Sequence, residues 1–419
     1  MIPDKTRRRV LFLGHTVPYP PTRGGFIRSY NVLRILAQEY DVRILCFERV
    51  GSARFKTSAD RAGAIEHLTS LGPTEIVPVP QATSTRAMLW DHTRSLLTGR
   101  VFTYYRYDST LFREKLEARL HEDVDLVHVD SLDLVRILPM LSHQMVVCTH
   151  HNVESELLMD RARASRSWPV RMYIGHQARL QRMAEQYWCP RVALNVTVSE
   201  RDARVLKGIA GGNGRYKVIP NGVDVRQVTP GNGSGIDILG LGGLEWFPNR
   251  DAADYLGAVI LPVLQKMTKQ PLSVTWVGSM PDEARALLEG AYGINCPGFV
   301  DDVRPYINRA TCYVLPYRLG GGTRLKMLEA LASGAAIVTT SMGALGVDIQ
   351  HGVNALLADD PDEFARAILC ILQNPSLRAS LGANARKTAV ERYSWEGIGQ
   401  KLTACYSQLM KQTPERTGP

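Results

Sequence analysis

The stretch RLGGGTRLKMLEALASGAAIVTT (residues 318–340) places three consecutive glycines before a helix-like run, a Ser-Gly stop and an apolar strand. It directly follows the strand-like run CYVLPY (residues 312–317), so the glycine loop begins where a predicted strand ends. Glycines let backbone N–H groups approach a ligand without side-chain obstruction. We expect Thr323 to cap a helix that begins at Arg324. Its free N–H groups and partial positive charge predict a phosphate or diphosphate site.

Charged side chains gather in the first turns of this predicted helix. Arg324 and Lys326 lie where the helix dipole disfavours cations, and a bound anion would offset that penalty. Lys326 and Glu329 are three residues apart and therefore adjacent on one helix face. A carboxylate one turn beyond a phosphate is well placed to accept hydrogen bonds from ribose hydroxyls. A surface Lys–Glu pair is the alternative, and the preceding glycine loop favours the ligand.

Composition limits the class of protein. The 419 residues exceed one ordinary hydrophobic core and predict two domains, and 45% hydrophobic residues predict a globular fold. Lys and Arg number 50 against 41 Asp and Glu, and this excess suits an anionic ligand, a nucleic acid or an acidic membrane surface. Seven scattered cysteines without a Cys-x-x-Cys pair predict reduced thiols and a cytoplasmic protein.

Strand-like apolar runs alternate with helical periods in both halves of the chain. VLFLG (10–14), a helical run (26–40) and VRILCF (42–47) form a βαβ unit, and the pattern returns from residue 236. Continuous apolar strands between helices predict parallel sheets that are covered on both faces. Glycine-rich turns predict a linker near 220–234. Ligands of such sheets bind beyond the carboxyl ends of the strands.

Several segments together resemble glycosyltransferase family 4, the bacterial polysaccharide and glycan type. The glycine loop and helix resemble the donor-binding segment of that family. Five further segments agree in order: PYPPTRGGFIRSYNVLRIL, LNVTVSERD, VIPNGVD, CPGFVDDVRPYINRATCYVLPY and SLRASLGANARKTAVERYSWEGIGQKL. The fourth of these, which contains Val300, resembles the segment beside the nucleotide base. The resemblance implies an α/β GT-B fold with two Rossmann-like domains facing across a cleft. Residues 1–220 would be the acceptor-side domain, 235–385 the nucleotide-sugar donor domain, and 386–419 a helix crossing back onto the first domain.

The resemblance also implies a function and a set of site residues. The protein would be a retaining, metal-independent glycosyltransferase that moves a hexosyl or related sugar from a nucleotide-diphosphate sugar to a hydroxyl acceptor, in exopolysaccharide or glycolipid synthesis. No cofactor is needed beyond this donor, and the acceptor would be a saccharide or a lipid-linked saccharide. The residues implied are His151, Lys326 and Arg324 for catalysis, Gly320, Gly321, Gly322, Thr323, Glu329, Val300 and Asn249 for the donor, and Gly24, Gly25 and Arg28 for the acceptor.

Two departures from the family pattern concern the donor. The first Glu of the usual Glu-x7-Glu pattern, which contacts the transferred sugar, falls on Gly321. The basic pair that usually follows the first strand of the second domain is replaced by Glu245 and Asn249. We therefore expect Arg324 and Lys326 to supply the charge that faces the diphosphate.

Histidines at the ends of predicted strands leave other functions open. His15, His128 and Asp130 could converge as the metal site of a hydrolase, although no His-x-x-x-His or His-x-Glu spacing occurs. A sugar-nucleotide epimerase of the same fold would need acid/base carboxylates that no motif identifies. Between His150 and His151 we favour the second as catalytic, because His-Asn-x-Glu is the closer match to the family. The basic residues look dispersed along the chain, which argues against a nucleic-acid binder.

Two basic elements of the first domain are ambiguous. Arg28 either helps to bind an anionic acceptor or is an ordinary solvated arginine. Residues 83–112 combine four arginines with Met88, Leu89, Trp90 and several tyrosines. This mixture is typical of a peripheral contact with an anionic membrane, at the inner face of the cell membrane. A helical hairpin whose aromatic rings are core is equally consistent with it.

Overall fold

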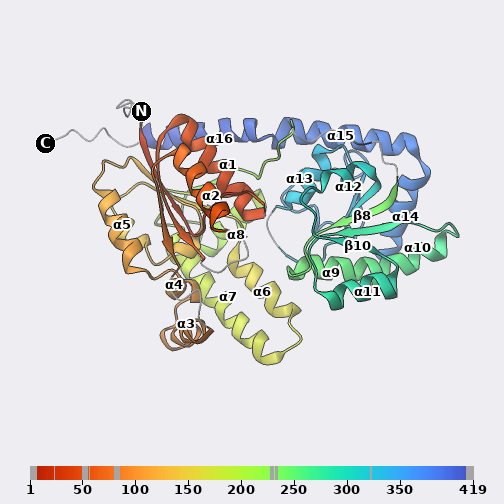
Figure 1. Cartoon of the computed structure of the whole chain (residues 1–419), viewed down its shortest axis with the longest axis horizontal. Coiled ribbons are helices and arrows are strands. Elements are labelled where there is room, and N and C mark those ends of the chain that lie inside the picture. Colours follow the sequence, from red (N-terminus) through yellow and green to blue (C-terminus); the bar gives the residue numbers. More distant parts are fainter. Residues whose placement is uncertain are drawn as a thin grey trace. The chain divides into compact units, whose positions relative to one another are not determined.

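The protein is described here by a computed structural model that covers residues 7–22, 24–49, 55, 57–79, 85–226, 231, 235–320 and 323–411. The chain divides into two compact units (Figure 1). The first comprises Met1–Ile219 and Gly399–Pro419, and the second comprises Pro220–Ile398. Each unit has one parallel sheet with helices on both faces, as the alternating sequence pattern predicts.

The first unit is built on a seven-stranded sheet in the order β3-β2-β1-β4-β5-β6-β7. The central strands are short apolar runs and every strand pairs in parallel with its neighbours, so crossover helices must cover both faces. The strands are β1 (Arg9–Gly14), β2 (Asp41–Glu48), β3 (Thr74–Pro78), β4 (Leu126–Val129), β5 (Val146–His150), β6 (Leu194–Thr197) and β7 (Tyr216–Val218). The helices are α1 (Gly24–Glu39), α2 (Ser58–Leu71), α3 (Thr85–Thr98), α4 (Phe102–Arg106), α5 (Thr110–Leu120), α6 (Glu154–Ala164), α7 (Trp168–Trp188) and α8 (Glu200–Ile209).

The second unit repeats this plan with six strands in the order β10-β9-β8-β11-β12-β13. Its strands are β8 (Ile236–Leu241), β9 (Val274–Val277), β10 (Asn295–Gly298), β11 (Ala310–Leu315), β12 (Ile337–Thr339) and β13 (Leu356–Leu357). Its helices include α9 (Phe247–Tyr255), α10 (Leu261–Met267), α11 (Asp282–Tyr292), α12 (Arg304–Arg309), α13 (Leu325–Ala332), α14 (Pro361–Gln373) and α15 (Pro375–Tyr393). Both sheets are therefore Rossmann-like, and the predicted α/β class is confirmed.

Strand order fixes where each unit can hold a ligand. In both sheets the chain changes direction of winding beside the first strand, between β1 and β4 in one and between β8 and β11 in the other. Ligands of open α/β sheets bind at this switch point, outside the carboxyl ends of the strands. The residues that follow β1 and β4, and those that follow β8 and β11, therefore form the two candidate ligand sites.

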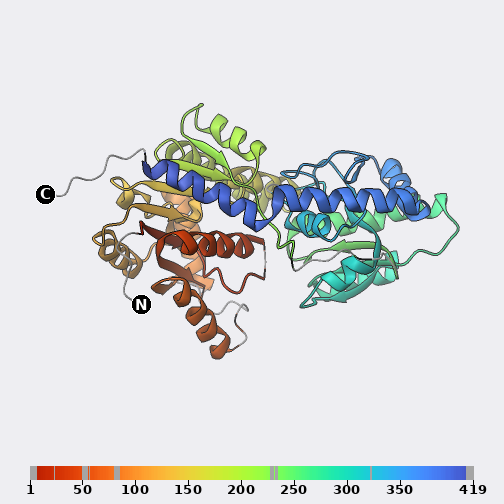
Figure 2. The same ribbon diagram turned by 90° about the horizontal axis from the view of Figure 1, so that it is seen from above.

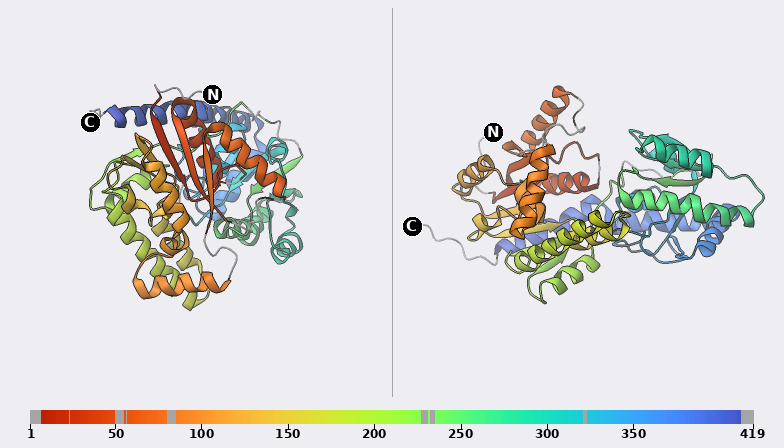
Figure 3. Two further views of the ribbon diagram at one scale, coloured as in Figure 1. Left: turned by 60° about the vertical axis from the view of Figure 1, so that its left-hand side comes forward. Right: turned by 90° about the horizontal axis from the view of Figure 1, so that it is seen from below.

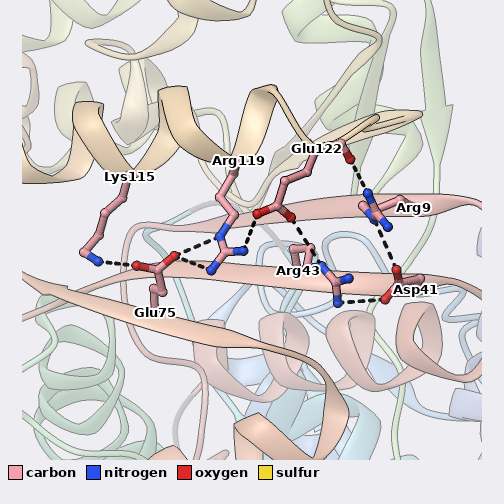
Figure 4. A network of polar contacts seen from close by, with 7 residues as sticks. All are labelled: Arg9, Asp41, Arg43, Glu75, Lys115, Arg119 and Glu122. Carbon is pink, nitrogen blue, oxygen red and sulfur yellow. Dashed lines mark hydrogen bonds and ion pairs between the residues drawn. The ribbon is translucent and has the colours of Figure 1, made fainter. Parts of the chain in front are cut away.

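A chain of ion pairs lies at the other end of the first sheet, where its first three strands begin (Figure 4). The charged residues at the amino ends of β1, β2 and β3 alternate in sign with those of α5 and its carboxyl end. The members are Arg9, Asp41, Arg43, Glu75, Lys115, Arg119 and Glu122. Because this network lies at the amino ends of the strands, we regard it as structural.

The last helix, α16 (Trp395–Lys411), begins in the second unit and ends in the first. Within the first unit it lies beside α1, as Figure 2 shows. A Cβ built at Gly399 would be in ordinary contact with Ile35 of α1, 3.4 Å away. Tyr40 Oη lies 3.1 Å from Ser407 Oγ on α16. None of the helices in the described ranges is long and apolar enough to cross a bilayer.

The turn VIPNGVD requires its glycine for a structural reason. The turn VIPNGVD packs against the end of α15, where Val223 donates to the carbonyl of Tyr393 at 2.7 Å. A side chain at Gly222 would meet the ring of Trp395 at 2.5 Å, so this turn requires glycine.

All seven cysteines lie in the described part of the chain as free thiols, and five of them are buried.

Candidate active site

The glycine loop of residues 318–322 connects β11 to α13. Gly320 has φ +100°, a conformation that favours glycine, while Gly321 and Gly322 lie outside the described residues. The predicted cap is wrong: α13 begins at Leu325, and its N-cap is Arg324, which is extended and makes no side-chain cap. The predicted stop is confirmed, because Gly334 adopts a left-handed conformation at φ +63°.

Lys326 reaches the switch point of the second sheet. Its Nζ donates to Oδ1 of Asn249 at 3.1 Å, and Asn249 belongs to α9, which follows β8. Oδ1 of Asn249 also accepts from the hydroxyl of Tyr317 at 2.9 Å, and its Nδ2 donates to the carbonyl of Gly243 at 2.7 Å. The ammonium group is thus held at the carboxyl end of β8 by a side chain that two other hydrogen bonds fix in place.

Glycines keep the space around this ammonium clear. A Cβ at Gly242 would lie 2.4 Å from Nζ of Lys326. A Cβ at Gly278 would lie 2.4 Å from the carbonyl of Gly242, so the loops after β8 and β9 touch backbone to backbone. Glu245, which stands where the family has a basic residue, accepts a hydrogen bond from Ser279 at 2.9 Å. The positive charge beside this loop therefore comes from Lys326 on α13.

Arg324 is more engaged within the protein than Lys326 is. Its Nη2 donates to the carbonyl of Leu319 at 2.7 Å, and its guanidinium lies 4.6 Å from the ring centre of Tyr317. Burial lowers its pKa and Tyr317 opposes this shift, but an arginine remains charged near neutral pH. Its buried Nε has no hydrogen-bond partner among the described residues. One buried N–H of Arg324 therefore lacks a partner within the described ranges.

Glu329 lies on α13 one residue short of a full turn beyond Lys326. Its side chain is partly buried and has no hydrogen bond or ion pair with any residue that the structure describes. Burial raises its pKa, and the nearby charge of Lys326 opposes that rise. A partly desolvated carboxylate without a partner gains from hydroxyl donors of a ligand. Val300, the other predicted donor residue, follows β10 and packs against the core of the unit.

The first unit brings polar side chains together at the ends of β1, β4 and β5. The carboxylate of Asp130 is fully buried and accepts from Ser29 Oγ at 2.6 Å. Nε2 of His151 lies 2.8 Å from the carbonyl oxygen of Asp130. A carbonyl can only accept, so Nε2 carries a proton and Nδ1 is the nitrogen that remains for another partner. His15, His128 and His151 each have a ring nitrogen 3.6–3.7 Å from the Asp130 carboxylate.

These neighbours set the protonation of the cluster. Burial alone would raise the pKa of Asp130, but the imidazole of His151 and those of His128 and His15 hold it well below its usual range. Burial lowers the pKa of His15 and of His128, and Asp130 opposes both shifts. The convergence that strand ends predicted is therefore real. However, no group of three or more His, Cys, Asp or Glu side chains within the described ranges is placed to hold a metal ion.

The two adjacent histidines have different surroundings. His150 points into the core, where its Nε2 lies 2.9 Å from Asn195 Oδ1, and burial lowers its pKa to about 4. His151 instead faces Asp130 and is partly exposed. This difference supports the choice of His151 as the candidate for chemistry, although its catalytic role stays a prediction.

The acceptor-side residues lie at the start of α1. Gly24 and Gly25 are its first two residues, and both are exposed. Arg28 is 1% exposed, so its interpretation as a solvated arginine is wrong. Burial lowers its pKa to about 10, and the charge of Asp130 opposes the shift. Arg28 therefore belongs to the buried polar cluster around Asp130, and its contact with an acceptor stays a prediction.

Sequence reasoning missed four polar residues of these sites. Tyr317 fixes Asn249, Ser29 binds Asp130, and Tyr406 of α16 lies 2.6 Å from Nδ1 of His128. The fourth, Glu154, accepts from Asn152 at 3.1 Å, and burial reinforced by Asp133 raises its pKa to about 7. Glu154 stands in the quoted His-Asn-x-Glu run, so a signal for it was present.

Comparison with known proteins identifies the class. Residues 23–227 match the family model described as Glycosyltransferase Family 4, and residues 235–374 match the model described as Glycosyl transferases group 1. The chain therefore belongs to glycosyltransferase family 4 and has the GT-B fold.

Individual relatives are distant. The chain is 27% identical to the MMP alpha-(1->4)-mannosyltransferase of Mycolicibacterium hassiacum, over 69% of this chain and 71% of that protein. The matches to three uncharacterised glycosyltransferases of Methanocaldococcus jannaschii span only 31%, 22% and 40% of those proteins. Sucrose-phosphate synthase from Thermosynechococcus elongatus has a similar fold, with a TM-score of 0.69 and 18% identity over 97% of this chain and all of the other. Anabaena HepE in complex with UDP-glucose is also similar, with a TM-score of 0.63 and 15% identity over 96% of this chain and 99% of the other.

Proposed function

We propose that this protein transfers a sugar, with retention of anomeric configuration, from a nucleotide-diphosphate sugar to a hydroxyl acceptor. The observation that carries the proposal is the position of Lys326. Its ammonium is held by Asn249 beside Gly242, in the loop that follows β8. This is the switch point where open α/β sheets bind ligands, and a cation there suits a diphosphate.

In the proposed reaction, the bond between the anomeric carbon and the diphosphate oxygen breaks, and a bond to the acceptor oxygen forms on the same face. The acceptor proton passes to the departing phosphate oxygen. The main task of the protein is then to stabilise the negative charge that builds up on the diphosphate. Lys326, the guanidinium of Arg324 and the first N–H groups of α13 supply positive charge for this task, so we propose that no metal is required.

Glu329 is proposed to bind the ribose of the donor. It lies on the same helix as Lys326 and lacks a partner among the described residues, so its oxygens are available to two vicinal hydroxyls. Val300 is proposed to lie beside the nucleotide base. Gly24, Gly25 and Arg28 are proposed to serve an acceptor that is a saccharide or a lipid-linked saccharide, and His151 to contact the transferred sugar.

Family membership supports transfer over the two alternatives. The matched models describe glycosyltransferases, and the relative with the longest alignment reported above is named a mannosyltransferase. A structural neighbour holds UDP-glucose, which is a donor of the proposed kind. Hydrolysis by a histidine-bound metal and epimerisation have no comparable support.

The stereochemical course tests the proposal. The full-length protein is incubated with UDP-, GDP-, ADP- and TDP-sugars and a panel of saccharide acceptors, and the anomeric protons of the first product are followed by NMR. We expect the new linkage to have the configuration of the donor. An inverted product would overturn retention, and no turnover with any donor would overturn the proposed transfer.

A further inference from the structure

Helix α3 has its polarity reversed relative to an ordinary surface helix. Its buried side chains are polar, Asp91 and Ser95, whereas its solvent face is apolar. That face carries Leu89, Trp90, Leu96 and Leu97, with Trp90 57% and Leu97 78% exposed. The four residues are spaced by one and seven positions, so they form two adjacent ridges on one side of the helix. Exposure of such an apolar face to water is unfavourable, which indicates that another apolar surface covers it.

The neighbouring helix α7 continues this apolar surface. Figures 1 and 3 show α3 alongside α7, and the contact runs through the rings of His92 and Tyr173 and through Ser95 with Gln177 at 2.7 Å. The first turn of α7 is exposed throughout and contains Trp168, Val170 and Met172. Trp168 is 74% exposed, although a tryptophan is the largest apolar side chain. The exposed apolar side chains of α3 and of the first turn of α7 are named here the α3–α7 surface.

Positive charge is concentrated in two longer stretches that contain α3 and the first turn of α7. Residues 85–107 and 161–184 together contain ten arginines, no lysine and one acidic residue, Asp91. Their formal charge of +9 equals that of the entire chain, so the remainder is neutral overall. The expectation that basic residues are dispersed is therefore wrong. Asp91 is buried, so the acidic partner is not displayed on the surface.

The structure divides the aromatic segment that the sequence left ambiguous. Tyr105 and Tyr107 are buried, so this part is core, as one of the two interpretations held. Arg94 lies over the ring of Tyr105 and Arg100 over that of Tyr104, at 4.3 and 4.4 Å from the ring centres. The exposed half is α3 itself. Residues 83 and 84 lie outside the described ranges.

We propose that the α3–α7 surface docks on an anionic lipid bilayer. Tryptophans among arginines suit the headgroup depth of a membrane, where rings meet the acyl boundary and cations meet lipid phosphates. A second copy of this chain fits poorly, because a symmetric contact would bring two surfaces of the same positive charge together. A soluble polyanion would use the arginines but would leave Leu89, Leu97 and Trp168 without a role.

Co-sedimentation of the full chain with vesicles tests this proposal. Vesicles of phosphatidylcholine alone are compared with vesicles that also contain phosphatidylglycerol, at low and high salt, and with duplex DNA as a competing polyanion. One variant combines Arg86→Glu, Arg166→Glu and Arg179→Glu, which are exposed positions. Its control combines Lys266→Glu, Lys269→Glu and Arg366→Glu, which are exposed on the second unit and change the net charge equally. A second variant combines Trp90→Ser and Trp168→Ser, with Leu287→Ser and Val390→Ser as its control.

We expect the protein to bind anionic vesicles only. The affinity for these vesicles should fall by at least about a hundredfold in the arginine variant and should not fall in its charge-matched control. The tryptophan variant should bind measurably more weakly than its own control. No binding to anionic vesicles at low salt, or an equal loss in the charge-matched control, would overturn the proposal. Unchanged binding of the tryptophan variant, or full displacement by DNA, would assign the surface to a soluble polyanion instead. Thermal melts confirm that each variant is folded.

Discussion

Replacing Lys326 by alanine removes the ammonium that the proposed diphosphate would meet. The substitution should leave the fold largely intact, because Oδ1 of Asn249 keeps its hydrogen bond from Tyr317 at 2.9 Å and Nδ2 keeps its bond to Gly243. Lys326 is also partly exposed, so the shortened side chain does not leave a sealed cavity. An effect on ligand binding can therefore be separated from an effect on folding.

The expected size follows from one lost charge-assisted hydrogen bond. Such a bond contributes roughly 1.5–3 kcal/mol, which corresponds to about a 10- to 150-fold weaker dissociation constant for the nucleoside diphosphate. If the charge on the departing diphosphate is also stabilised, kcat should fall as well as the affinity. The corresponding nucleoside lacks phosphates, so its affinity should not change.

Calorimetry of the nucleoside diphosphate and the nucleoside, together with steady-state rates of transfer, measures all three effects. Lys266→Ala is the matched control, because Lys266 is an exposed lysine of the same unit on α10. Equal affinity and equal rates in Lys326→Ala and the control would refute the assignment of Lys326 to the diphosphate. An equal loss for the nucleoside would show that the damage is structural.

Three further predictions concern Glu329, the metal and the two histidines. Burial raises the pKa of Glu329, so the folded state holds its proton more tightly and loses stability as pH rises through the window above the unfolded pKa. Glu329→Gln should therefore be more stable than the wild type above about pH 4 and equal below it, by thermal melts, while it binds nucleotides with intact ribose hydroxyls more weakly. A 2′,3′-dideoxy nucleotide that loses as much affinity as the natural one would contradict the ribose role. Transfer should continue in EDTA, whereas complete loss that a metal restores would favour the histidine cluster as a metal site. His151→Ala should lower kcat with little change in Tm. His150→Ala should lower Tm, because it removes the partner of Oδ1 of the buried Asn195, at a cost of about 1–3 kcal/mol. A reversed pattern would exchange the roles of the two histidines.

Features that depend on short stretches of sequence were predictable. The glycine loop, the left-handed Gly334 and the convergence of His15, His128 and Asp130 follow from strand ends and turn chemistry. The cap was expected at Thr323, one residue too early, because spacing alone leaves the end of a helix uncertain by one or two residues. The backbone instead stays extended through Arg324, one residue further along.

Features that depend on distant parts of the chain were not predictable from spacing. Tyr317 and Asn249 are 68 residues apart, and Tyr406 is 278 residues from His128. The concentration of charge was missed for the same reason, since α3 and α7 are separate in the sequence and become neighbours only in the fold. The burial of Arg28 could not be read from a charged residue in an amphipathic helix, where exposure is the ordinary outcome.

The central claim is that the amino end of α13 binds the diphosphate of a nucleotide sugar, and titration calorimetry of the unmodified protein tests it most directly. UDP, GDP, ADP and TDP are each titrated beside the matching nucleoside, without added metal. We predict that at least one diphosphate binds, and that its nucleoside binds at least about tenfold more weakly, because the nucleoside cannot meet Lys326. Failure of every diphosphate to bind, or equal affinity for a diphosphate and its nucleoside, would contradict the account.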